Sequence, residues 1–244
     1  MVSAMLRLQK FLAQAGLGSR RSCEQFIKDN RVSVNGKVAA LGKKVSENDE
    51  VTFDGNRVLP KAADLKVIML NKPRGVLSSK KDDKKIKLVF DFLPKVFNEP
   101  DWIAVGRLDI NTSGLMLFTN DGKLAHQLMH PSFEIDREYL VRARGNFNEQ
   151  KKKNMLSGVE IEDEIYQFSD IVPGEKQSSN RWFSVCMLTG KNREVRKLFE
   201  SQDLEVSRLK RVRIGPIFLP STLKEGSCIN LTEAQIKELQ NYGK

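Results

Sequence analysis

The feature that most constrains the fold is a series of short β-favouring runs that fills the chain from Leu65 onward. These runs include VIML, WIAV, GLMLFT, REYLVRARG and RWFSVCML, which are rich in β-branched and aromatic residues. Turn signals such as Asn120-Asp121-Gly122 separate many of them, and the helical stretches between them are short. We therefore expect an α+β domain over residues 65–244, built on a largely antiparallel mixed sheet.

The first 64 residues carry a different pattern, which predicts two short helices and two hairpins. The apolar residues repeat at helical spacing, Gly16 ends the first helix, and Ser19 is a favourable N-cap for the second. Asn35-Gly36 and Asp54-Gly55 each lie between short β-favouring runs, where such pairs form tight turns. We expect a small separate α/β module over residues 1–64.

The net charge of the chain indicates a polyanionic partner. Lys and Arg number 41 against 31 Asp and Glu, which gives a net charge of +10 and a pI near 9.5. The segment Lys66–Lys87 holds 8 basic and 2 acidic residues, and Lys191–Arg213 holds 8 and 4. In the first module, the basic residues expected to face solvent are Arg7, Lys10, Arg20 and Arg21. Nucleic acid is the partner that this distribution favours.

Several classes of site and location are disfavoured by the sequence. The three cysteines lie far apart, and His126 and His130 have no third ligand at matching spacing, so we expect neither a disulfide framework nor a metal site. No GxGxxG, GKS or GKT motif is present, so we expect no nucleotide cofactor. The sequence lacks a run of about 18 apolar residues and an apolar signal core, which predicts a cytoplasmic protein without membrane attachment.

The densest group of polar residues follows the β-favouring run that ends at Gly106. It holds hydrogen-bonding side chains between two apolar runs, an arrangement that suits an active-site loop. The residues of this group are Arg107, Asp109, Asn111, Thr112, Ser113 and Gly114.

Asp109 is open to four interpretations. A calcium loop would need a bidentate Glu at its twelfth position, where Asn120 stands. A phosphatase-type nucleophile would usually need a second acid at Asn111 and further Mg²⁺ ligands. A structural role, in a pair with Arg107 or in capping a turn, is common for Asp in loops. A lone catalytic carboxylate is the fourth interpretation, because no second acid is nearby for ordinary glycoside hydrolysis.

Four stretches of the chain resemble known motifs in the order of one enzyme family. GRLDINTSGLMLFTNDG, LNKPRGV and TGKNREVRKLFE resemble the Asp-bearing, Lys-Pro and Arg-bearing motifs of pseudouridine synthases. RLQKFLAQAGLGSRRSCEQFIKDNRVSVNGK resembles an S4-like RNA-binding module. Together they resemble the RsuA-like family of ribosomal RNA pseudouridine synthases over nearly the whole chain. The resemblance implies an S4-like module over 1–64 and a pseudouridine synthase domain over 65–244.

The resemblance also implies roles for three catalytic residues. Asp109 matches the catalytic carboxylate, and Tyr139 matches the tyrosine that stacks against the target base. Arg196 matches the arginine that pairs with the aspartate, with Arg193 as the less favoured partner, and such a pair would keep a buried carboxylate ionised. The sequence leaves open whether the carboxylate attacks C1′, attacks C6 or promotes elimination to a glycal-type intermediate.

Further residues take substrate-binding or supporting roles by the same likeness. Arg107 is expected near the RNA backbone, or in the gap left by a displaced nucleotide. Lys72, also counted among the RNA-binding residues, is expected with Pro73 to shape the floor below the catalytic loop. Leu188 is expected to pack against the Tyr139 ring. Many relatives have Lys-Thr-Tyr where this chain has Arg137-Glu138-Tyr139, so the role of Arg137 stays open.

The expected function is the isomerisation of a uridine in ribosomal RNA, with the base turned out of its stack. The likeness favours one position of 23S rRNA, in free RNA or a pre-50S particle, and a monomeric enzyme without cofactor or metal. Two alternatives remain. One is a non-catalytic RNA-binding ribosome-assembly factor with the same fold, and the other is a synthase for 16S rRNA of the small subunit.

Overall fold

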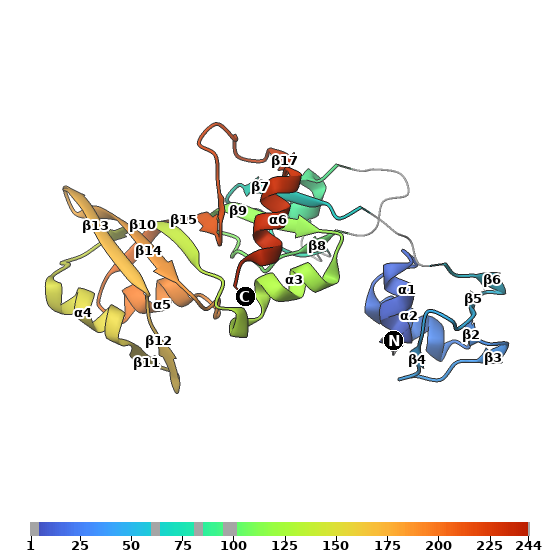
Figure 1. Cartoon of the computed structure of the whole chain (residues 1–244). Coiled ribbons are helices and arrows are strands. Elements are labelled where there is room, and N and C mark those ends of the chain that lie inside the picture. The colour runs from blue at the N-terminus through green and yellow to red at the C-terminus, as the bar shows by residue number, and fades with distance from the viewer. Residues whose placement is uncertain (1–4, 60–63, 81–84, 95–101, 244) are drawn as a thin grey trace. The chain divides into compact units, whose positions relative to one another are not determined.

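The computed structural model describes residues 5–59, 64–80, 85–94 and 102–243, and it divides into two compact units (Figure 1). One unit contains the chain up to Asp64, and the other begins at Leu65. Within the described ranges, no helix is long and apolar enough to cross a membrane.

The first unit combines two helices with short strands. Strands β3, β2, β5 and β6 form one sheet in that order, and β1 pairs with β4. The elements are β1 (Leu6–Arg7), α1 (Leu8–Gln14), α2 (Arg20–Lys28), β2 (Val32–Val34), β3 (Lys37–Val38), β4 (Lys44–Val45), β5 (Val51–Phe53) and β6 (Asn56–Arg57).

Local sequence signals explain these elements. The Ser19 hydroxyl accepts a hydrogen bond from the Ser22 amide at 3.1 Å and so caps α2 as predicted. Both predicted hairpins are confirmed, because Asn35-Gly36 joins β2 to β3 and Asp54-Gly55 joins β5 to β6, all four residues having positive φ. One face of the two helices packs with the sheet in a core that includes Leu8, Leu12, Cys23, Ile27 and Val32.

The second unit is built on one large sheet with helices on both faces. Its elements are β7 (Val67–Lys72), η1 (Val89–Phe92), β8 (Ile103–Ala104), β9 (Ser113–Thr119), α3 (Gly122–Met129), η2 (Pro131–Phe133), β10 (Arg137–Arg144), α4 (Glu149–Ser157), β11 (Val159–Ile161), β12 (Glu164–Tyr166), β13 (Asp170–Gln177), β14 (Asn180–Met187), α5 (Glu194–Glu200), β15 (Glu205–Ile214), β16 (Ile217–Phe218), β17 (Cys228–Asn230) and α6 (Glu233–Asn241).

The sheet runs in the order β13-β14-β10-β15-β9-β7-β17, with β16 beside β15 and β8 beside β9. Its pairs are antiparallel except for β15 with β9, where Arg211 lies beside Gly114. A Cβ on Gly114 would lie 2.1 Å from the Arg211 carbonyl oxygen, so this close approach of two strands requires glycine. The expected α+β fold on a largely antiparallel mixed sheet is confirmed.

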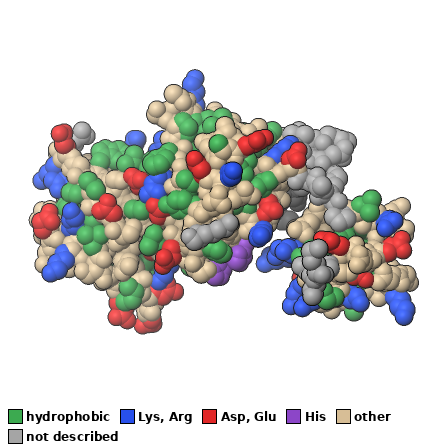
Figure 2. Space-filling view, in the orientation of Figure 1, with side chains coloured by type: hydrophobic (Ala, Val, Ile, Leu, Met, Phe, Trp, Pro, Cys, Tyr) green, Lys and Arg blue, Asp and Glu red, His purple; other side chains and the backbone are tan. Residues whose placement is uncertain are grey.

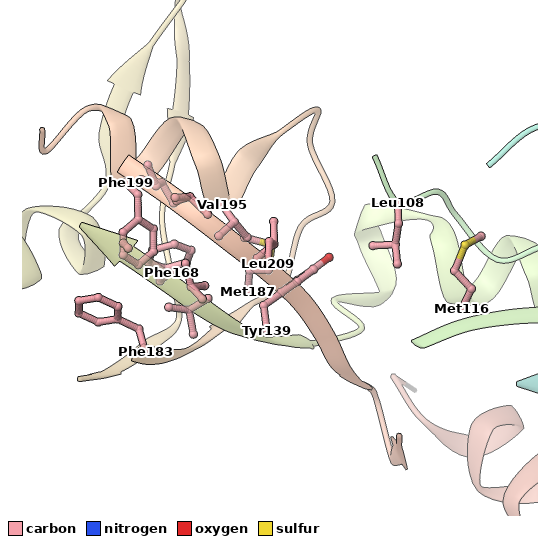
Figure 3. Packing of buried hydrophobic residues seen from close by; sticks show 14 of the residues in the cluster. Leu108, Met116, Tyr139, Phe168, Phe183, Met187, Val195, Phe199 and Leu209 are labelled. Atoms are coloured by element: carbon pink, nitrogen blue, oxygen red, sulfur yellow. The ribbon is translucent and has the colours of Figure 1, made fainter. Parts of the chain in front are cut away.

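Two cores cover opposite faces of this sheet. Helices α3 and α6 pack against β7 and β9, and Figure 1 shows α6 in front of these strands and α3 below them in the view. Helix α5 packs against β10 and β14 in the larger core, which contains Phe168, Phe183 and Phe199 (Figure 3). The larger core continues to Leu108 and Tyr139, so it reaches the polar loop singled out in the sequence.

Candidate active site

The polar loop between β8 and β9 is fixed by hydrogen bonds to the segment that follows β7. The Ser78 hydroxyl donates to the Leu108 carbonyl at 2.7 Å and accepts from the Leu108 amide at 3.2 Å. The Gly75 amide donates to the Ile110 carbonyl at 2.8 Å. Asp109 lies half-buried between these two anchor points. A carboxylate held this way keeps its position while still reaching solvent or a ligand.

Lys72 holds the same loop from below. Its side chain is completely buried, and its amine donates to the carbonyls of Thr112 at 2.8 Å, Asp109 at 3.1 Å and Ile110 at 3.4 Å, and of Pro73 at 3.2 Å. Burial lowers the pKa of this amine to about 8, and the negative charge of Asp109 opposes that shift. Lys72 therefore forms the floor of the loop and cannot contact RNA in this structure, which corrects its inclusion among the RNA-binding residues.

Tyr139 lies on β10, with its side chain 7% exposed at the edge of the larger core. Figure 3 shows its hydroxyl pointing away from the three phenylalanines, toward the side of the sheet where Leu108 lies. Since Leu108 immediately precedes Asp109, the ring and the carboxylate belong to the same end of the core. The Tyr139 hydroxyl therefore points toward the end of the core from which the loop of Asp109 begins.

Arg196 lies on α5, which packs on the same face of the sheet. Its guanidinium donates to the Val206 carbonyl at 3.0 Å. Burial lowers its pKa, Arg193 lowers it further, and Asp109 raises it, so the carboxylate acts electrostatically on this arginine. Among the described residues, however, no ion pair joins Asp109 to a cation within 4.0 Å. The expected Arg196–Asp109 pair is thus a proximity of charges here and not a direct contact.

Two further residues of the prediction are Leu188 and Arg193. Leu188 follows the last residue of β14 and is 37% exposed. Its neighbour Met187 is 1% exposed and lies beside the Tyr139 ring in Figure 3. Arg193 pairs with Glu200 at 3.5 Å, so it is not the partner of Asp109 in this structure.

The remaining predicted residues lie on the surface. Arg107 is exposed beside the loop. In the first unit, Arg7, Arg20 and Arg21 are exposed and Lys10 is half-buried. His126 and His130 stack with ring centroids 4.9 Å apart. Nowhere in the described residues do three or more His, Cys, Asp or Glu side chains gather as a metal site would require.

Comparisons with known proteins show the family and the fold of this chain. Residues 66–201 match the family described as RNA pseudouridylate synthase, and residues 6–51 match the S4 domain. The chain belongs to the RsuA-like family of pseudouridine synthases. It is 47% identical over 235 residues to the ribosomal large subunit pseudouridine synthase B of Pseudomonas aeruginosa, covering 94% of this chain but 60% of that protein.

Other relatives and a solved structure extend this likeness. The proteins of the same name from Vibrio vulnificus and Salmonella typhi are 48% and 44% identical, covering 96% of this chain and 74% and 82% of theirs. A crystal structure of a pseudouridylate synthase superimposes with a TM-score of 0.65 at 27% identity, covering 96% of this chain and 99% of that one. This chain therefore shares its fold with that pseudouridylate synthase.

Sequence reasoning assigned no role to three residues that shape the candidate site. Arg137 donates to the carbonyls of Leu128 and Ile135 at 3.0 and 2.8 Å, and its longer bonds to Leu188 and Thr189 tie β10 to the loop before α5. This answers the question left open for Arg137, which acts here as a backbone anchor. The motif could not predict this role, because every residue has a backbone carbonyl and the sequence does not show which carbonyls lie near Arg137.

Glu194 and Arg211 are the other two missed residues. Glu194 is buried, and its carboxylate accepts from the Thr189 hydroxyl and, at 2.9 Å, from the Lys191 amide, which shapes the loop before α5. Arg211 is 3% exposed, and its Nε donates to the Leu115 carbonyl at 2.8 Å. For Glu194, the only signal in the sequence was its position within the late motif. Arg211 could not be distinguished from the other basic residues of its strand.

Proposed function

We propose that this chain converts a specific uridine of 23S ribosomal RNA to pseudouridine, in free RNA or in a pre-50S particle, as a monomeric cytoplasmic enzyme. Family membership supports the reaction, and the names of the relatives support the large-subunit substrate. The observation that carries the assignment of the site is the placement of Asp109 on an anchored loop, within electrostatic influence of Arg196.

In the proposed reaction, the bond between ribose C1′ and uracil N1 breaks, the base turns, and a bond forms between C1′ and C5. The proton on C5 leaves, and N1 takes up a proton, so the reaction is an isomerisation. The target nucleotide must first leave its stack, at a cost of a few kcal/mol that contacts to RNA offset. Asp109 supplies the carboxylate that acts on the nucleotide, and the nearby positive charge of Arg196 favours its ionised form.

Tyr139 and Arg107 complete the proposed site. The Tyr139 ring provides a face on which the displaced uracil stacks, since aromatic side chains hold unstacked bases in this way. Arg107 is exposed beside Asp109 and is placed to contact the RNA backbone or to occupy the gap that the displaced nucleotide leaves.

The first prediction tests the chemistry with ribosomal RNA labelled with tritium at uridine C5. The wild-type chain should release tritium to water, and Asp109→Asn should lower the rate by roughly 100-fold or more, because the amide cannot act as a carboxylate. RNA affinity should be retained. The matched control is Asp163→Asn, an exposed carboxylate in the turn between β11 and β12.

Activity that survives Asp109→Asn would show that the chemistry lies elsewhere. RNA binding by a wild-type chain that releases no tritium would favour the non-catalytic assembly factor. Mapping pseudouridines in both ribosomal RNAs from a strain that lacks this protein identifies the substrate. A position missing from 16S rRNA instead of 23S rRNA would overturn the large-subunit assignment.

A further inference from the structure

Strand β10 separates two very different surfaces. Tyr139, Val141 and Ala143 point into the larger core, and the residues between them point to the other face of the sheet. We call that other face, over β10, β13, β14 and β15, the outer face. Hydrophobic side chains gather in the open over this end of the sheet in Figure 2. The exposed apolar members of the outer face are Leu140 at 38%, Trp182 at 37% and Val172 at 53%.

The strand register places these residues in rows with basic side chains. Arg142 lies directly opposite Arg208 on β15 and Trp182 on β14. In the next row, Leu140 lies opposite Lys210. Side chains opposite one another on neighbouring strands share a face, so three cations and an exposed indole lie together on the outer face.

No helix among those described covers this surface. Helices α4 and α5 contribute Met155, Leu198 and Phe199 to the larger core, on the opposite face of these strands. Helices α3 and α6 belong to the other core, which lies over β7 and β9. The apolar side chains of the outer face are therefore open to a partner molecule.

Among the described residues, some cations of the outer face are paired with carboxylates and three are not. Arg144 pairs with Glu205 at 2.9 Å, and Arg213 pairs with Glu138 at 3.0 Å. Within the described part of the chain, Arg142, Arg208 and Lys210 form no ion pair. Two arginines directly opposite each other repel, and this repulsion is relieved when an anion binds between them.

We propose that the outer face binds a second segment of RNA, with phosphates on Arg142, Arg208 and Lys210 and an unpaired base stacked on Trp182. Guanidinium groups bind phosphate oxygens through paired hydrogen bonds, and exposed aromatic rings hold unstacked bases. An acidic protein would satisfy the cations but gives no particular reason for an exposed indole beside them. The proposal rests on the proposed function in one respect, that the RNA belongs to the ribosomal substrate.

Because Tyr139 faces the opposite way on the same strand, the RNA on the outer face is not the segment that enters the active site. The outer face therefore contributes to affinity and to the choice of substrate, and it does not take part in the chemistry. Variants of the outer face should change the RNA concentration needed for half-maximal rate and leave kcat unchanged.

The test uses the full chain and deproteinised 23S ribosomal RNA, with affinity measured by filter binding over a range of KCl concentrations. The double variant Arg142→Gln, Arg208→Gln should bind about tenfold more weakly, and its slope of log affinity against log salt should fall by about 1 to 2, since each lost phosphate contact removes about 0.7 to 0.9. The matched control is Lys152→Gln, Lys153→Gln on α4, which removes the same charge from outside the outer face.

The indole gives a second readout that does not depend on catalysis. The chain contains two tryptophans, so in a Trp102→Phe background the fluorescence reports Trp182 alone. Stacking of a base should quench this fluorescence on RNA binding, and Trp182→Ala should weaken binding about tenfold. Circular dichroism establishes that each variant is folded.

Unchanged RNA affinity and salt slope in the arginine variant would overturn the proposal. An acidic protein would then be the favoured partner of the outer face. Equal weakening in the α4 control would also overturn it, because the effect would then be general charge. Binding is measured without turnover. A wild-type chain that binds RNA through this face but releases no tritium would therefore contradict the proposed function and leave the RNA-binding proposal intact.

Discussion

Lys72 and Arg211 are buried cations that bond to no carboxylate among the described residues. Lys72 donates to four backbone carbonyls, and Arg211 donates to one while its Nη2 has no partner among the described residues. Backbone carbonyls are fixed by the fold, so a cation bonded to them holds a loop in position without neutralising Asp109. A carboxylate in their place would compete with Asp109 for Arg196.

The Lys72→Met variant tests this role at the scale of one residue. Met fills the same volume but donates no hydrogen bond, so carbonyls of the catalytic loop lose their partner. We expect a loss of about 2 to 3 kcal/mol in the free energy of unfolding, because bonds to a charged group are lost. The kcat for tritium release should fall on the order of 100-fold, because the carboxylate is displaced.

The matched control is Lys237→Met, which removes an exposed charge from α6. Urea titrations give the stability of both variants, and tritium release under saturating RNA gives kcat. A Lys72→Met chain with a normal kcat would mean that the amine does not position the catalytic loop.

In helix α2, the helical spacing of apolar residues determines that the Cys23 thiol is buried. Helical spacing directs Cys23 and Ile27 inward, and both are buried with Leu12 and Val32 in the core of the first unit. Burial raises the pKa of the Cys23 thiol from 9.0 to about 11. The folded helix therefore keeps the thiol protonated at pH values where the unfolded chain has ionised it.

The raised pKa of Cys23 makes the stability of the fold depend on pH. Between pH 9 and 11 the folded state binds more protons at this site than the unfolded state, so stability falls as pH rises. Relative to Cys23→Ala, the wild type should lose up to about 2 to 3 kcal/mol by pH 11. Urea unfolding, followed by amide signals of the first unit, measures this difference. A difference that is constant from pH 8 to 11 would contradict the shifted pKa.

Strand β14 illustrates how far the sequence could predict the site. Its alternation places Phe183, Val185 and Met187 on the face of the larger core, which a period of two residues predicts. The same alternation directs Leu188, which follows the last residue of the strand, to the opposite side, where it is 37% exposed. The motif likeness names Leu188 as the neighbour of the Tyr139 ring, whereas the alternation alone points to Met187, which lies beside that ring in Figure 3.

At the scale of the whole molecule, the fold class, the hairpins and the order of motifs could be predicted, because each depends on residues close together in the chain. The neighbours of Asp109 could not be predicted from the sequence. Lys72 bonds to the catalytic loop, and Arg196 acts on it electrostatically, both from segments far from it in sequence, and the β-bulges of β15 shift its register against β10. Spacing along the chain says nothing about such contacts.

The two units also differ in where their cores lie, and this permits a prediction about their independence. The core of the first unit contains residues between Leu8 and Val58, and both cores of the second unit contain residues from Leu65 onward. A chain of residues 65–244 should therefore fold alone, with dispersed amide signals in NMR. Its affinity for 23S ribosomal RNA should fall about tenfold or more, because the basic residues of the S4 domain are lost.

A second variant separates charge from folding in this experiment. In the full chain, Arg20→Gln with Arg21→Gln keeps the first unit and removes two exposed cations at the start of α2. If these arginines contact phosphates, the variant should show part of the affinity loss of the shortened chain and a slope against salt reduced by about 1 to 2. Binding as tight as that of the wild type, together with weak binding by 65–244, would move the RNA contact to another surface of the first unit. An unfolded 65–244 chain would show that the second unit needs the first for stability.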